Sequence, residues 1–69
     1  MRIISQDGTL SVNFEDCEIK VQDDCIIYRS DKSKGMLGRY KSIEEAIEIF
    51  NEIHDAWVDE YTFTVYEMP

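Results

Sequence analysis

Residues 42–58, SIEEAIEIFNEIHDAWV, decide the fold class because the spacing of apolar residues changes here from two residues to three or four. Ser42 and Glu45 are spaced as a capping box, a pair that satisfies the first free backbone N–H groups of a helix. The pattern after them predicts one amphipathic helix that ends near Val58. The predicted apolar stripe consists of Ile43, Ala46, Ile47, Phe50, Ile53, His54 and Trp57.

Two hairpins are predicted before this helix. Asp7-Gly8 is a strong signal for a two-residue type I′ turn, because glycine adopts positive φ freely and aspartate tolerates it. With these residues in the loop, Ile3 pairs with Val12, and apolar and polar side chains separate onto opposite faces. A second turn at Asp23-Asp24 pairs Val21 with Ile26, Ile19 with Tyr28, Lys20 with Ile27 and Glu18 with Arg29.

Two further strands complete the predicted fold. Residues 36–40 return as a short strand after a polar loop, and residues 61–66 alternate as a strand rich in β-branched and aromatic side chains. The sequence therefore predicts a single α+β domain over residues 1–69. Its small, hairpin-rich antiparallel sheet has about five to six strands, and one amphipathic helix packs on one face. The strand order stays open.

The composition restricts the partners. Fifteen acidic against seven basic residues give 69 residues a formal net charge of -8. This charge disfavours direct binding to nucleic acid or an anionic membrane, and favours a basic protein partner. No apolar stretch approaches the roughly 18 residues that span a bilayer, and the N-terminus does not have a signal-peptide pattern. Cys17 and Cys25 fall on opposite faces of their hairpin, so we expect reduced thiols and a cytoplasmic location.

Catalytic chemistry has little support in the sequence. His54 is the only histidine, and it falls on the apolar side of the predicted helix, where a partly buried structural role is the simpler interpretation. Nothing nearby completes a nucleophile, base and orienting group. The three glycines are scattered, so no phosphate-binding loop is predicted, and no EF-hand pattern is present. We therefore expect no enzymatic activity, no metal and no cofactor.

Charge is distributed unevenly along the chain. Residues 1–28 sum to -4, residues 29–41 to +4, and residues 42–69 to -8, with no lysine or arginine in the last segment. Acidic residues recur at three- and four-residue spacing along the predicted helix, where like charges repel each other. One interpretation is a solvated face that keeps a small protein soluble. The other is a docking surface for a basic partner, spaced to imitate a phosphate backbone, with Glu48, Glu52, Asp55 and Asp59 as the predicted contact residues.

An apolar surface is the alternative interface. The strand patterns place Tyr66, Ile4 and Ile27 on outward faces. If these side chains lie together, they form an exposed apolar patch of the kind that mediates protein association. The alternative function is therefore that of a small phage or bacterial accessory or regulatory protein that acts through an apolar homodimer interface.

The segment RIISQDGT at residues 2–9 resembles the start of a group of short hypothetical proteins from Gram-positive bacteria and their phages. The resemblance continues at GRYKS, residues 38–42, which leads into a helix rich in Glu and Ala. It implies a phage or mobile-element setting. In such settings small acidic proteins often block host nucleic-acid-binding defence proteins, as anti-restriction and anti-CRISPR proteins do. The expected function is non-catalytic inhibition of such a basic protein.

Overall fold

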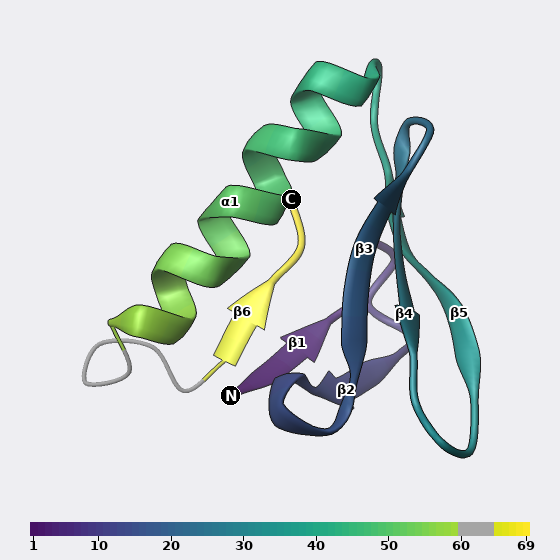
Figure 1. The fold of residues 1–69 in the computed structure, drawn as a ribbon, viewed down its shortest axis with the longest axis vertical. Coiled ribbons are helices and arrows are strands. Elements are labelled where there is room, and N and C mark those ends of the chain that lie inside the picture. The colour runs from purple at the N-terminus through teal and green to yellow at the C-terminus, as the bar shows by residue number, and fades with distance from the viewer. Residues whose placement is uncertain (60–64) are drawn as a thin grey trace.

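The computed structural model describes residues 1–59 and 65–69, which form an α+β fold with two three-stranded sheets and a 16-residue helix (Figure 1). One sheet has the order β2-β1-β6 and the other the order β3-β4-β5. A 3-10 turn at Phe14–Asp16 connects the two sheets. The strands are β1 (Arg2–Ile4), β2 (Ser11–Asn13), β3 (Glu18–Gln22), β4 (Cys25–Arg29), β5 (Lys34–Arg39) and β6 (Val65–Glu67), and the helix is α1 (Ile43–Val58).

The predicted α+β class and number of strands are confirmed, but the single antiparallel sheet is wrong. β2 is only three residues long, and the 3-10 turn after it redirects the chain, so the second hairpin starts a separate sheet. β6 pairs with β1 in parallel, which is possible because the long connection through α1 brings the chain back to the same end of the sheet. Of the strand predicted at residues 61–66, residues 61–64 lie outside the described part of the chain.

The registers of both hairpins are confirmed, whereas the type of the first turn is not. Ile3 pairs with Val12 in the first hairpin, and Glu18 pairs with Arg29 in the second. In the first turn Gly8 has a positive φ of 76°, but Asp7 does not, so the loop is not type I′. The Asp7 carboxylate instead closes a wider loop by accepting hydrogen bonds from the Ser5 hydroxyl, the Thr9 amide and the Thr9 hydroxyl.

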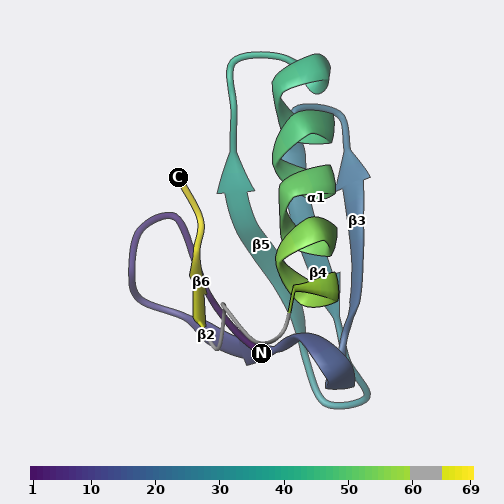
Figure 2. The ribbon, with the colours of Figure 1, turned by 90° about the vertical axis from the view of Figure 1, so that its left-hand side faces the viewer.

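The core is shared by both sheets and the helix. The largest fully buried side chains are Ile3, Ile26, Leu37 and Ile53, which come from β1, β4, β5 and α1. α1 contacts β3 and β4, and Figure 2 shows it running alongside the β3-β4-β5 sheet. One core cluster therefore joins side chains from both sheets and the helix.

The predicted apolar stripe of the helix is partly wrong. Its buried residues are Ala46, Ile49, Ile53 and Ala56. Ile43 and Ile47 are 47% and 44% exposed. The apolar residues of this helix cover a wide arc, and packing against β3 and β4 selects the part that contains two alanines, whose small side chains allow close approach.

Gln6 connects the two sheets. Its backbone N–H donates to the Leu37 carbonyl at 2.7 Å, and its side-chain oxygen accepts from the Arg39 N–H at 2.9 Å. Its side-chain nitrogen donates to the Pro69 carbonyl at 3.0 Å. One residue of the first loop therefore covers part of the β5 edge and holds the C-terminal residue.

The predicted helix cap is present, and both cysteines are free. The Ser42 hydroxyl accepts from the Glu45 N–H at 3.2 Å, and the Glu45 side chain accepts from the Lys41 N–H at 3.3 Å. The thiols of Cys17 and Cys25 donate to the Asn13 carbonyl and to the Asp24 carboxylate, respectively. No helix in residues 1–59 and 65–69 has the length and hydropathy needed to cross a membrane.

Candidate partner-binding surface

The four predicted contact residues lie along one side of α1. Glu48, Glu52 and Asp55 are exposed helical residues, and Asp59 is the exposed C-cap, whose N–H donates to the Asp55 carbonyl at 3.1 Å. At 3.6 residues per turn, these four positions fall within an arc of about 60°. We call this set, Glu48, Glu52, Asp55 and Asp59, the acidic row. The helix geometry therefore brings all four carboxylates onto one continuous strip.

Three carboxylates of the acidic row have no cation paired with them in the described part of the chain. Glu48, Glu52 and Asp55 form no ion pair with a lysine or arginine of residues 1–59 and 65–69. The ion pairs of those residues lie elsewhere, between Met1 and Glu15 and between Arg39 and Asp24. The last turn of α1 contains no basic residue either, so its carboxylates face the negative end of the helix dipole. Electrostatics within α1 therefore disfavour this row.

Glu52 also has a structural contact that sequence reasoning missed. Its side chain accepts a hydrogen bond from the Tyr66 hydroxyl at 3.2 Å, which links α1 to β6. Tyr66 is 8% exposed, so its predicted position in an exposed apolar patch with Ile4 and Ile27 is wrong. The outward residue is its neighbour Val65, because parallel pairing with β1 turns Tyr66 towards the core. Burial, and then the Glu52 carboxylate, raises the pKa of Tyr66.

A second tyrosine lies in the core close to the helix. Burial, followed by the negative charges of Glu45 and Glu52, raises the pKa of Tyr40 to about 12. The Tyr40 hydroxyl is buried and has no hydrogen-bond partner among the described residues. Gly38 makes room for it, because a Cβ atom at that position would lie 2.6 Å from the hydroxyl oxygen. Glu52 therefore influences two buried tyrosines as well as the surface.

His54 lies at the edge of the core, as predicted. Its Nδ1 atom is 2.8 Å from the Phe50 carbonyl oxygen, and its ring packs against the rings of Phe14 and Phe50. Burial is the main cause that raises the pKa values of the Cys17 and Cys25 thiols, which disfavours the reactive thiolate form. Within the described part of the chain, no three His, Cys, Asp or Glu side chains are grouped so as to hold a metal ion.

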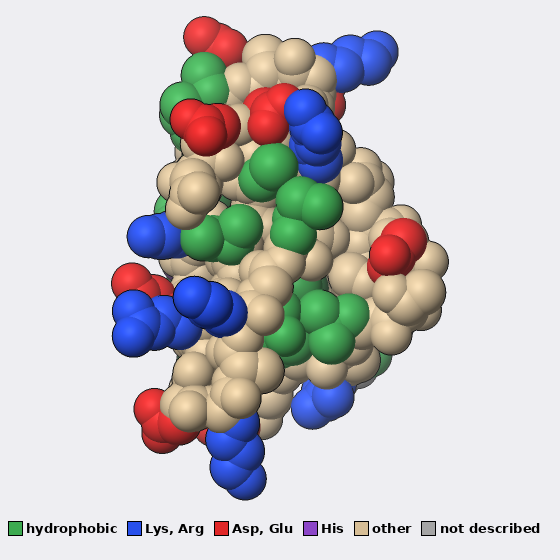
Figure 3. Space-filling view, turned by 90° about the vertical axis from the view of Figure 1, so that its right-hand side faces the viewer, with side chains coloured by type: hydrophobic (Ala, Val, Ile, Leu, Met, Phe, Trp, Pro, Cys, Tyr) green, Lys and Arg blue, Asp and Glu red, His purple; other side chains and the backbone are tan. Residues whose placement is uncertain are grey.

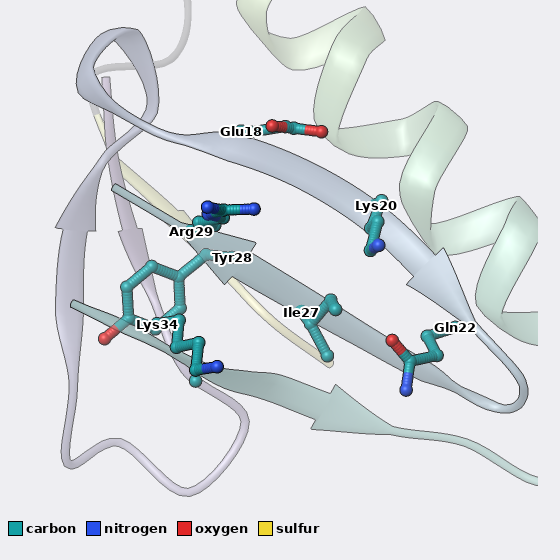
Figure 4. A pocket seen from close by; sticks show the side chains of 8 residues that line it. Glu18, Lys20, Gln22, Ile27, Tyr28, Arg29 and Lys34 are labelled. Carbon is teal, nitrogen blue, oxygen red and sulfur yellow. The ribbon is translucent and has the colours of Figure 1, made fainter. Parts of the chain in front are cut away.

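A second charged surface lies on the outer face of the β3-β4-β5 sheet; the sequence indicated that residues 29–41 are basic but did not group Lys34 and Arg29 with Lys20 on one face. Figure 3 shows hydrophobic side chains in the middle of the side opposite α1, with lysine and arginine side chains around them. A hollow of about 470 Å³ lies over these strands (Figure 4). The alternation of residues along β3 and β4 predicts which of their side chains face outward. The full surface also needs β5 beside β4, and the sequence pattern did not predict that pairing. The hollow is lined by Glu18, Lys20, Gln22, Ile27, Tyr28, Arg29, Lys34 and Gly35.

Comparison with known proteins adds no assignment to either surface. No protein-family model matches the chain, and no curated protein or solved structure matches it. A functional interpretation of the two surfaces therefore rests on the charge and burial of the described side chains.

Proposed function

We propose that this chain is a non-catalytic binding protein whose acidic row docks onto a cationic surface of a partner protein. The observation that carries the proposal is the row itself. Its carboxylates lie on one helix face, and Glu48, Glu52 and Asp55 form no ion pair with the lysines and arginines of the described residues. The proposal includes α1 lying with its other side on the strands, which the shared core cluster supports.

The energetics of the row support an intermolecular role. Each pair of like charges at three- or four-residue spacing destabilises a helix by about 0.2–0.5 kcal/mol. Two successive pairs lie within α1, Glu48 with Glu52 and Glu52 with Asp55, so they cost roughly 0.4–1 kcal/mol in the free protein by that rule. A cationic partner converts this repulsion into attraction, and complementary charge also accelerates association.

The narrower form of the proposal is inhibition of a host nucleic-acid-binding defence protein. Proteins that bind nucleic acid present lysine and arginine to the phosphate backbone, and a row of carboxylates can occupy the same surface. The resemblance of residues 2–9 and 38–42 to proteins of Gram-positive bacteria and their phages supports this choice. The two free thiols fit a reducing compartment, so we propose that the protein acts in the cytoplasm.

The test is affinity capture from a Gram-positive host lysate at low and high salt with three baits. The wild type is compared with a row variant, Glu48→Gln/Glu52→Gln/Asp55→Asn/Asp59→Asn. The matched control, Asp16→Asn/Asp23→Asn/Asp31→Asn/Glu67→Gln, removes four charges elsewhere. Both variants change the formal net charge of -8 by +4, to -4.

We expect the wild type and the control to retain a basic protein at low salt and to release it at high salt, while the row variant does not retain it. Glutamine at position 52 keeps an acceptor for the Tyr66 hydroxyl, so the row variant is expected to fold. If the row variant captures the same protein as the control, the acidic row is not the docking surface.

A homodimer with an apolar interface is the second candidate. Tyr66 is buried, but Ile43 and Ile47 are exposed one turn apart on α1 and offer a different apolar patch. A dimer made through them would show twice the monomer mass in light scattering at both low and high salt, and Ile47→Glu would abolish it. A monomeric wild type at high protein concentration would exclude this candidate.

A further inference from the structure

The outer face of the β3-β4-β5 sheet has a charge opposite to that of the whole chain. Lys20, Arg29 and Lys34 are exposed around the hollow, and none of them forms an ion pair in residues 1–59 and 65–69. Glu18 is the acidic residue of the lining, so the lining carries a net charge of +2 in a chain of -8. We call Lys20, Arg29 and Lys34, with Ile27 between them, the cationic face.

The hairpin registers explain this arrangement. Residues that alternate along β3 and β4 point to opposite sides of the sheet, so Lys20, Ile27 and Arg29 share the outer side. Arg29 pairs with Lys34 of β5, which places two cations side by side on neighbouring strands. Glu18 is the register partner of Arg29, but no ion pair joins their side chains. The two neighbouring cations are thus left available to an external anion.

An apolar centre lies between these cations. Ile27 is half-buried although it points outward, and its partner in β5, Met36, is 53% exposed. Gly35 makes room for the ring of its register partner Tyr28, because a Cβ atom at position 35 would lie 3.1 Å from Cε1 of that ring. An apolar centre with a charged rim is the usual composition of a protein–protein contact.

We propose that the cationic face is a second docking surface, which binds an acidic segment of a partner protein that carries an apolar side chain. The segment places its carboxylates against Lys20, Arg29 and Lys34 and its apolar side chain over Ile27. At physiological ionic strength charges beyond about 8 Å are largely screened, so the local cations act on the segment despite the net charge of the chain. The protein would thus bind partners of opposite charge on two different surfaces.

Other occupants fit the face less well. Small-molecule sites usually contain polar groups fixed by burial, whereas all three cations here are exposed. Duplex nucleic acid carries a charge every 1.7 Å or so, but its phosphate backbone has no apolar group to place over Ile27 and the exposed Met36. A second copy offers the exposed side chains of Ile47 and Val58 beside its acidic row, so self-association of the wild type is measured as a competing outcome.

The test uses a fluorescent synthetic decapeptide of alternating Glu and Ser with a central Leu, measured by anisotropy at low and physiological salt. The face variant Arg29→Gln/Lys34→Gln is compared with Arg2→Gln/Lys41→Gln, a control with the same net charge of -10. Removal of two exposed ion pairs is expected to weaken binding between about 2-fold and 30-fold in the face variant. The control should change the affinity for the peptide by less than about 2-fold.

Two further measurements separate this surface from the acidic row and from unfolding. Glu18→Gln removes the acidic residue of the face and should tighten binding, which a damaged fold cannot do. The row variant should bind the peptide at least as tightly as the wild type, so a failure of the proposed function leaves this test intact. In NMR spectra the peptide should shift the signals of the Ile27 methyl groups and the Gly35 amide.

Four results would overturn the inference. The first is equal loss of binding in the face variant and the control. The second is equal binding of a peptide with Gln in place of Glu. The third is tighter binding of a single-stranded oligonucleotide of the same length. The fourth is salt-sensitive self-association of the wild type that the face variant abolishes, which would make a second copy the occupant.

Discussion

The hydrogen bond between Glu52 and Tyr66 makes one residue of the acidic row part of the fold. Glu52→Ala removes the acceptor and leaves the Tyr66 hydroxyl, on a side chain only 8% exposed, without its partner. An unsatisfied buried polar group costs about 1–3 kcal/mol. Because Glu52 is itself exposed and water reaches its carboxylate, we expect the lower part of this range, about 1–2 kcal/mol.

Glu48→Ala is the matched control, because Glu48 lies one turn away on the same helix, is exposed and has a side chain that forms no hydrogen bond in the described structure. Both substitutions remove one negative charge and introduce alanine inside α1, so the change in helix propensity is the same. The control should change the free energy of unfolding by less than about 0.5 kcal/mol. Glu52→Gln keeps an acceptor and should resemble the control more than it resembles Glu52→Ala.

The assay is urea denaturation of these variants, together with Tyr66→Phe and the Glu52→Ala/Tyr66→Phe double variant. If thermal unfolding is measured as well, a loss of 1 kcal/mol should lower the Tm by about 4–8 °C in a domain of this size. The double-variant cycle should give a coupling of at least about 0.5 kcal/mol, because the two side chains interact directly. If Glu52→Ala is as stable as Glu48→Ala, or if the cycle gives no coupling, the bond contributes nothing and this reasoning is wrong.

Three further predictions concern the scaffold. Gly38→Ala should destabilise the protein by about 1–3 kcal/mol in urea denaturation, because its Cβ meets the Tyr40 hydroxyl; wild-type stability would contradict that contact. Gln6→Ala removes two side-chain hydrogen bonds and should lower the free energy of unfolding by about 1–3 kcal/mol. It should also speed hydrogen exchange of the Arg39 amide, whereas Gln6→Glu keeps the acceptor for that amide and should protect it. Equal exchange in both variants would refute the bridge. Hydrogen bonds from Thr9 and Ser5 lower the pKa of Asp7 from 3.8 to about 2, so the Asp7 carboxylate stabilises the fold above pH 3.8 and loses this effect as the pH falls towards 2. The stability difference between wild type and Asp7→Asn should therefore shrink over that range. A constant difference would contradict the lowered pKa.

Local patterns predicted the hairpin registers and the helix start correctly. Alternation fixes which strand residues share a face, since a slip of one residue would expose the apolar set, and Ile3 accordingly pairs with Val12. The N-cap was equally predictable because Ser42 and Glu45 interact within one turn. The row of carboxylates on one side of the helix likewise follows from helical spacing alone.

Features that depend on long-range packing were not predictable in the same way. Parallel pairing of β6 with β1 joins the two ends of the chain, and it turns Tyr66 inward against the expectation from alternation. The exposure of Ile43 and Ile47 depends on which part of a wide apolar arc meets the strands. The cationic face needed the placement of β5 beside β4, which brings Lys34 next to Arg29.

The docking role of the acidic row can be measured as the affinity of the captured basic protein at increasing salt concentration. The wild type, the row variant and the control variant are compared. Four exposed charge pairs at about 0.2–1 kcal/mol each predict that the row variant binds between about 4-fold and several hundred-fold more weakly than the wild type. The control should retain most of the wild-type affinity and the same steep dependence on salt. Equal weakening of both variants would show that overall charge, not the row on α1, determines binding.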